Sequence, residues 1–158
     1  MKINYPKLIL SIFICLLAGF LGSYFTAPAI STWYVYLQKP FFSPPNWIFA
    51  PVWTTLYILM GISAGLVWQK GLDNKKVKLA LSIFGVQLVL NILWSFMFFG
   101  LQIPFLGLVT IIFLWLAILI TIKKFLKINR TAGLLLIPYI LWVSFASILN
   151  LAIHLLNR

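Results

Sequence analysis

The sequence predicts an all-α membrane protein built as a bundle of five transmembrane helices, and two observations carry this prediction. Hydrophobic residues make up 63% of the 158 positions and charged residues only 8%, with a mean hydropathy of +1.09. A soluble domain has about 25% charged residues. The apolar residues also gather in five runs, each close to the roughly 20 residues that a helix needs to cross a bilayer.

These runs are separated by polar or positively charged connections. Because lipid offers no hydrogen-bond partners, backbone groups must be satisfied within each segment, and the runs lack the alternation of a barrel strand. The predicted spans are residues 8–25, 47–68, 79–99, 105–122 and 132–155. No internal repeat or shift in composition divides the chain, so residues 1–158 are predicted to form a single membrane domain.

The first run also resembles a secretory signal peptide, with Lys2 and Lys7 ahead of an apolar centre. Two features favour a retained span. Residues 8–25 are about long enough to cross a hydrocarbon core of about 30 Å, and no clean A-x-A cleavage site follows them. We therefore expect the first helix to remain part of the protein.

Positive charge is distributed unevenly among the connections. Ten of the twelve lysines and arginines precede the first span or lie in the second and fourth connections, whereas Lys39 and Arg158 belong to the opposite side. This bias predicts a multi-pass protein with a cytoplasmic N-terminus and an external first loop. Short basic clusters beside spans favour contact with anionic lipid headgroups, and they disfavour nucleic acid as a partner.

The first connection is rich in prolines and aromatic residues around a single cation, Lys39. Pro40, Pro44 and Pro45 fix φ and remove backbone donors, so this loop is expected to be stiff. A stiff aromatic loop between two spans is suited to covering a pocket.

Polar residues inside the spans indicate what this loop covers. Gln87, Asn91 and Ser95 recur every four residues and form one stripe, which must face other helices or a cavity. One interpretation is hydrogen bonding between helices, worth about 0.6 kcal/mol per side chain. The other adds Trp53 and Trp142, several residues into their spans, and predicts a flat-walled cavity for a planar, largely apolar molecule.

Other residues restrict the chemistry. The single acidic residue, Asp73, lies in the second connection, which excludes a carboxylate acid–base pair and disfavours proton-coupled transport. No zinc-ligand cluster or phosphate-binding glycine loop occurs. His154, near the end of the fifth span, is interpreted first as an interfacial residue and second as a haem ligand.

Two features concern the shape and packing of the helices. Pro138 predicts a kink in the fifth span. Gly61 and Gly65, spaced as G-x-x-x-G, permit either a dimer seam or close packing within the chain.

Three blocks of residues, in this order along the chain, resemble the TspO/MBR family. The first block runs from the loop into the second span, the second lies in the third span and the third in the fifth. The matching residues are Trp33, Tyr34, Leu37, Lys39, Pro40, Pro44, Pro45, Phe49, Pro51, Val52, Trp53, Leu56, Tyr57, Met60 and Gly61; Gln87, Leu90, Asn91, Trp94, Ser95 and Phe98; and Pro138, Tyr139, Trp142, Val143, Phe145, Ala146, Leu149 and Asn150.

The resemblance implies a five-helix bundle, commonly a homodimer, with a pocket under the first loop that binds porphyrins such as protoporphyrin IX or haem as ligand, with no cofactor required. Carried over residue by residue, the implied ligand-binding positions are Tyr34, Pro45, Phe49, Trp53, Asn91, Trp94, Trp142, Ala146 and Leu149.

The resemblance also implies, for some relatives, light- and oxygen-dependent porphyrin breakdown. Trp53 and Trp142 would take a photochemical role in it, since no conventional catalytic constellation is present. Sterol binding is not carried over, because no Lys or Arg follows Tyr139 before Arg158. Gly85 stands alone in the third span, where the family's dimer seam has small residues, so the dimer interface is not assigned.

The leading functional hypothesis is therefore a membrane protein that binds tetrapyrroles and senses or regulates their level. Two alternatives stay open at this point. One is a transporter or channel for porphyrins or small solutes, and the other is a non-catalytic partner in membrane assembly.

Overall fold

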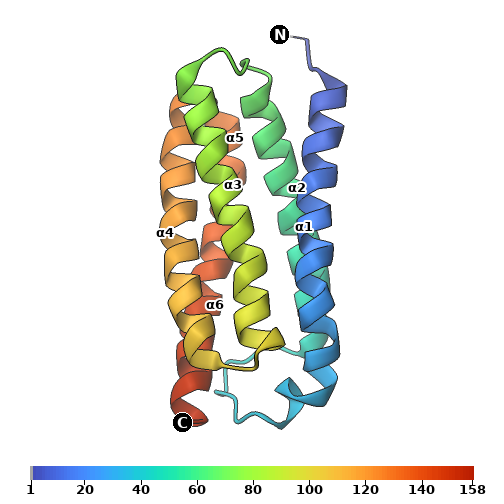
Figure 1. Cartoon of the computed structure of the whole chain (residues 1–158), viewed down its shortest axis with the longest axis vertical. Helices are drawn as coiled ribbons and strands as arrows, with labels where there is room; N and C mark the ends of the chain where they lie inside the picture. The colour runs from blue at the N-terminus through green and yellow to red at the C-terminus, as the bar shows by residue number, and fades with distance from the viewer. Residues whose placement is uncertain (1) are drawn as a thin grey trace.

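The prediction of an all-α membrane protein with five spans is confirmed by the structure, a computed structural model that describes residues 2–158. Helices long and apolar enough to cross a membrane cover Tyr5–Thr32, Asn46–Trp68, Lys75–Gly100, Pro104–Ile128 and Arg130–Leu156. Within the described residues there is no β-strand. The helices lie roughly parallel to one long axis (Figure 1).

Four of the spans are built on one long helix and the fifth on two consecutive helices. Short helical turns occupy the first connection and the end of the third span. In chain order the elements are α1 (Tyr5–Thr32), η1 (Tyr34–Tyr36), η2 (Asn46–Ile48), α2 (Phe49–Trp68), α3 (Lys75–Ser95), η3 (Phe96–Gly100), α4 (Pro104–Ile128), α5 (Arg130–Leu135) and α6 (Ile137–Leu156).

Each predicted span falls within a longer helical segment. The helices α3 and α4 continue into their lysine-bearing ends, at Lys75 and Lys127, because a lysine stem can lie along apolar surface while its ammonium group reaches the headgroups. The helix α1 continues through Pro28 to Thr32. Hydropathy therefore located the hydrocarbon-crossing part of each helix but not its ends.

Two irregularities shape the bundle at opposite levels. Pro138 lies in the first turn of α6, directly after the break at Leu136 that separates α5 from α6, so the fifth span is interrupted where the sequence predicts a kink. At the end of α3, η3 is a π turn in which the N–H of Leu101 donates to the carbonyl of Phe96 at 2.7 Å. π turns often occur at functional sites, because they change which side chains face inward.

The close approach of α1 and α2 depends on Gly61 and Gly65. A Cβ on Gly61 would lie 2.4 Å from Cα of Ile12, and one on Gly65 would lie 2.9 Å from Cδ1 of Leu8. Of the two alternatives for the G-x-x-x-G spacing, the structure therefore shows close packing within the chain. The dimer stays a prediction without an assigned interface.

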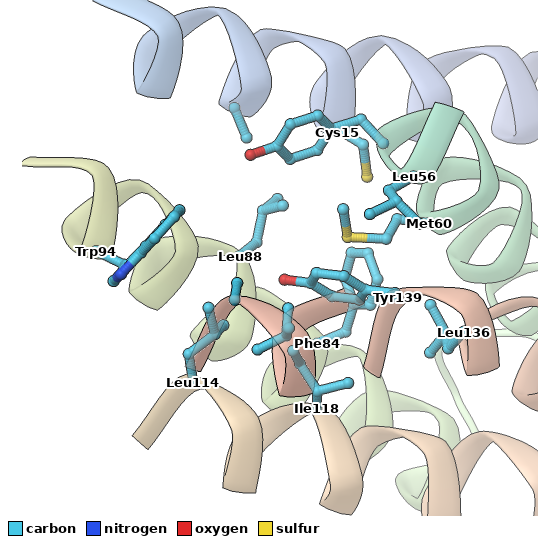
Figure 2. Packing of buried hydrophobic residues seen from close by; sticks show 14 of the residues in the cluster. Cys15, Leu56, Met60, Phe84, Leu88, Trp94, Leu114, Ile118, Leu136 and Tyr139 are labelled. Atoms are coloured by element: carbon cyan, nitrogen blue, oxygen red, sulfur yellow. The ribbon is translucent and has the colours of Figure 1, made fainter. Parts of the chain in front are cut away.

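The interior is closed by large side chains from all sides. Figure 2 shows Tyr139 of α6 pointing into the bundle beside Met60 of α2, with Leu88 and Phe84 of α3 nearby. Met60 is 0% exposed and Tyr139 is 1% exposed. These side chains are packed in the middle of the bundle, and the spaces described below lie toward the lid end.

The helices alternate in direction, so the connections fall at two ends (Figure 1). Residues 33–48, which we call the lid, lie at the same end as the turn at residues 101–103 and the C-terminus. The N-terminus and the connection at residues 69–74 lie at the other end.

Candidate ligand pocket

Two polar side chains hold the lid: Lys39 bonds to carbonyls within it, and Asn157 bonds it to the end of α6. The ammonium group of Lys39 donates to the carbonyls of Tyr34 at 2.8 Å and Leu37 at 3.2 Å, and it lies 4.8 Å from the centroid of the Tyr34 ring. The side chain of Asn157, just after α6, accepts from the N–H of Gln38 at 3.0 Å and donates to its carbonyl at 2.8 Å. The lid is therefore held at its middle, through Gln38, to the C-terminal end of the chain.

Beneath the lid lies a small space of about 30 Å³, which we call the inner hollow. The lid, α2, α3, η3 and α6 all contribute to it, and most of its lining is aromatic. The lining residues are Tyr34, Phe49, Trp53, Trp94, Phe98, Phe99, Trp142, Ala146, Leu149, Asn150 and Ile153. Since pockets for drug-sized ligands measure about 300–1,000 Å³, a ligand enters this space only if the lining moves.

Seven of the nine ligand-binding residues expected from the sequence line the inner hollow, and Pro45 and Asn91 do not. Pro45 is exposed and directly precedes η2. Asn91 is 1% exposed, and its side chain is hydrogen-bonded to Tyr57 and Tyr139. The amide of Asn91 therefore supports neighbouring residues in this structure and does not face the hollow.

Flat aromatic faces form the wall of the inner hollow. The ring centroids of Trp53 and Trp94 lie 6.0 Å apart at an interplanar angle of 36°, and Trp94 stacks on Phe98 at 6.0 Å and 29°. On the α6 side, Phe49 meets Trp142 edge-on at 6.3 Å. Offset and edge-to-face arrangements of this kind are the favoured geometries of aromatic pairs, and the wall presents ring faces on which a planar molecule can stack.

Two buried polar atoms next to the inner hollow have no hydrogen-bond partner: the hydroxyl of Tyr34 and the indole Nε1 of Trp142. Burial raises the pKa of Tyr34, so its phenol keeps its proton. The neighbouring Ser43 hydroxyl lowers that pKa in part, although the two oxygens do not meet in hydrogen-bond geometry. Buried donors are rarely left unpaired in proteins, so these two are candidates for contact with a ligand.

Behind the aromatic wall, a chain of hydrogen bonds joins α2, α3 and α6; we call it the buried network. The hydroxyl of Tyr57 donates to Asn91 Oδ1 at 2.6 Å, and Asn91 Nδ2 donates to the hydroxyl of Tyr139 at 2.7 Å. That hydroxyl donates in turn to Gln87 Oε1 at 2.8 Å. The ring of Trp53 lies 5.7 Å from that of Tyr57 and 6.3 Å from that of Tyr139, so the network fixes the surface against which Trp53 packs.

A second and larger space, which we call the crevice, lies between α1 and α2 near the lid end and has a volume of about 330 Å³. Its lining comes mainly from one face of α1 and the first turns of α2. The residues are Leu16, Gly19, Phe20, Gly22, Ser23, Thr26, Ala27, Ile30, Asn46, Phe49, Ala50, Trp53, Thr54, Tyr57, Trp94, Ser95 and Phe99. Phe49, Trp53, Trp94 and Phe99 also line the inner hollow, so these four side chains separate the two spaces.

Sequence reasoning did not assign the α1 side of the crevice, and it did not assign Phe99 to the pocket. The π turn explains the second omission, because it buries the consecutive rings of Phe98 and Phe99, 4.7 Å apart, on the same side. The small residues Gly19 and Gly22 were the available signal in α1. His154 packs against Phe105 at 5.5 Å and lines neither space.

The sequence model of the TspO/MBR family matches residues 11–156. The chain belongs to this family. It is 50% identical over 155 residues to the tryptophan-rich protein TspO of Archaeoglobus fulgidus, covering 98% of this chain and 99% of that one. It is 39% identical to protein CrtK of Rhodobacter capsulatus, covering 90% and 88% of the two chains. The human translocator protein is 36% identical over 135 residues, covering 85% of this TspO/MBR protein and 80% of the human one. The family membership inferred from the three residue blocks is therefore confirmed.

Proposed function

We propose that this protein binds a tetrapyrrole of the protoporphyrin IX or haem type in the space under the lid, and that it senses or regulates the level of that pigment. The observation that carries the proposal is the combination of flat aromatic walls with two buried, unpartnered donors at Tyr34 and Trp142. A porphyrin offers a planar apolar ring for stacking and carboxylate groups that accept hydrogen bonds.

The small volume of the inner hollow has a consequence for binding. A tetrapyrrole fits only after Phe49, Trp53 or their neighbours rotate, which would join the hollow to the crevice. The two spaces together fall within the size range of ligand pockets. Binding is then accompanied by a rearrangement of aromatic side chains, and this rearrangement lowers the apparent affinity by the cost of opening.

Quenching of tryptophan fluorescence by protoporphyrin IX tests this proposal. We expect saturable quenching of the purified protein at micromolar pigment, and its loss in the double variant Trp53→Ala/Trp142→Ala. The matched control is Trp47→Ala, because Trp47 is 72% exposed on the lid and lines neither space. Unchanged quenching in the double variant, or loss of the same size in the control, would remove the pocket assignment.

Light-dependent breakdown of the bound pigment is a second candidate function. It is favoured by the indoles of Trp53 and Trp94, which lie 6.0 Å apart in the wall, and by Trp142, whose Nε1 is unpartnered. The expected result is loss of the porphyrin absorbance band under illumination in air, slowed in Trp142→Phe and unchanged in Trp47→Phe. Equal loss in empty detergent micelles would eliminate this role.

The alternative of a transporter or channel predicts a different result. In the described part of the chain the buried polar side chains are uncharged, whereas ion and proton pathways across membranes usually carry ionisable groups. Flux of porphyrin between the two sides of sealed proteoliposomes would favour transport. The assembly alternative predicts one stoichiometric protein partner and no pigment binding.

We further propose that the N-terminus lies in the cytoplasm and the lid outside. The structure brings the N-terminus and the basic second and fourth connections to one end of the bundle, and the lid with Lys39 and Arg158 to the other. This asymmetry follows the positive-inside rule. Labelling with an impermeant maleimide tests it, because Cys15 is the sole cysteine and is buried. A cysteine introduced at exposed Phe41 should react in intact cells, and one at Asp73 should not.

A further inference from the structure

The helices α1 and α2 form a wedge whose closed end is set by glycine. At that end, Gly61 and Gly65 lie directly against Ile12 and Leu8 of α1. Toward the lid the helices separate, and the crevice occupies the gap from Leu16 to Ile30 on α1. The crevice is therefore a consequence of how the two helices cross, with contact at one end and separation at the other.

The crevice opens on the side of the bundle that faces lipid. On its α1 side Phe20 is 68% exposed and Ala27 is exposed, and on its α2 side Ala50 and Thr54 are exposed. All four belong to segments long and apolar enough to span the membrane. A molecule dissolved among the acyl chains can therefore reach the crevice without crossing the headgroup layer.

Three hydroxyl groups that line the crevice on α1 and α2 already have partners within their own helices. The hydroxyls of Ser23, Thr26 and Thr54 donate to the backbone carbonyls of Phe20, Gly22 and Ala50 at 2.8, 3.1 and 2.8 Å. These three hydroxyl groups therefore do not need a ligand as a hydrogen-bond acceptor. The surface suits a flat, apolar molecule that passes through, in contrast to the inner hollow with its unpartnered donors.

The lid is the competing route to the inner hollow, and it is closed by more specific contacts. Opening it breaks the paired hydrogen bonds between Asn157 and Gln38. Passage from the crevice requires rotation of Phe49 and Trp53, whose residues are only partly buried and whose side chains make ring contacts but no hydrogen bond that the structure shows.

We propose that the ligand reaches the inner hollow sideways from the bilayer, through the crevice between α1 and α2, with Phe49 and Trp53 as a movable partition between the two spaces. This inference rests on the proposed function, since it takes the same planar apolar ligand as the molecule in transit. Continuity carries the argument: the two spaces share the four aromatic side chains that separate them, and the larger space is the one open to lipid.

The test blocks the crevice without touching the inner hollow. Ala27→Phe and Ala50→Phe add a ring to exposed positions that line only the crevice. The control Leu21→Phe places a ring on an exposed position of α1 that lines neither space. Each variant is reconstituted in lipid vesicles, and protoporphyrin IX is supplied from protein-free vesicles that already contain it. Its uptake and release are followed by its own fluorescence, which gives rates and an equilibrium constant separately.

We expect both crevice variants to slow uptake and release together by about tenfold or more, as an added barrier of this kind does. The equilibrium constant should change by a smaller factor than either rate, because the bound pigment occupies the inner hollow and only the adjoining part of the crevice. The control should match the wild type. Unchanged rates in the crevice variants, with faster exchange in Asn157→Ala, would show passage under the lid and overturn the inference. Weakened equilibrium binding in Ala27→Phe with unchanged binding in Trp142→Phe would place the ligand in the crevice itself and would also overturn it. Failure of the proposed function looks different: no variant, nor the wild type, would bind the pigment.

Discussion

Replacing Tyr139 by Phe tests the buried network and measures how much the packing behind the aromatic wall depends on it. The hydroxyl of Tyr139 is the centre of the network: it accepts from Asn91 at 2.7 Å and donates to Gln87 at 2.8 Å. The substitution keeps the ring and removes both bonds. Because Tyr139, Asn91 and Gln87 are each 1% exposed, the stranded amide groups have no route to water.

The magnitude follows from those two bonds. Hydrogen bonds between membrane helices average about 0.6 kcal/mol each, and a buried polar group left without its partner costs about 1–3 kcal/mol. Tyr139→Phe should therefore lower the free energy of unfolding by about 1–3 kcal/mol. Tyr57→Phe removes only the terminal bond of the network, to Asn91 at 2.6 Å, and leaves one buried acceptor without a donor, so it should cost less than Tyr139→Phe, which strands two groups.

The assay is equilibrium unfolding of the purified protein by sodium dodecyl sulfate in mixed micelles, followed by circular dichroism. Tyr24→Phe is the matched control, because Tyr24 is 73% exposed on α1, and its free energy of unfolding should equal that of the wild type. The double variant Tyr57→Phe/Tyr139→Phe should be less destabilised than the sum of the two single variants, since both lose bonds to Asn91. The network would be refuted if Tyr139→Phe had the same free energy of unfolding as Tyr24→Phe. It would also be refuted if the losses in the two single variants added exactly in the double variant.

Two further predictions concern helix packing and the lid. Gly61→Ala should lower the free energy of unfolding by about 1–3 kcal/mol, because the added methyl lies 2.4 Å from Cα of Ile12 and α1 must shift. The comparison is Gly85→Ala, because a Cβ at Gly85 would have no atom within 4 Å. In the same measurement, its free energy of unfolding should rise by up to about 1 kcal/mol, since alanine has the higher helix propensity. Asn157→Ala should free the lid at Gln38, which hydrogen–deuterium exchange would detect as faster exchange in the lid, with the helices unchanged. Equal stability of the two glycine variants, or unaltered lid exchange, would contradict these assignments.

The arrangement of spans could be predicted from the sequence because the bilayer allows few solutions. An apolar run of this length has to be a helix, and the fifth span is interrupted next to Pro138, where the sequence predicts a kink. The helix ends could not be predicted from hydropathy. Lysine-bearing turns such as the one at Lys75 are helical but not apolar, and α1 continues through Pro28.

The residues of the pocket could likewise be predicted only in part. The sequence indicated which aromatic residues belong together, because Trp53, Trp94 and Trp142 fall on inward faces of helices with regular geometry. It did not indicate that Phe99 joins them, since only the π turn brings that ring inward. It also assigned Asn91 to the ligand, whereas the structure uses this amide between two tyrosines. Regular periodicity can be read from a sequence, but a local change of helical pitch and the choice of a hydrogen-bond partner depend on the packed neighbours.

The most direct test of the account is an equilibrium titration of protoporphyrin IX against the wild type, Trp142→Ala and Trp47→Ala, read from the emission of the pigment. Stacking on one aromatic face is worth about 0.5–1.5 kcal/mol, so the account predicts one binding site per chain and a dissociation constant about two- to twelvefold higher in Trp142→Ala. It predicts no change in Trp47→Ala. The absence of saturable binding in the wild type, or an equal effect of the two substitutions, would contradict the claim that the aromatic space under the lid is the site of the pigment.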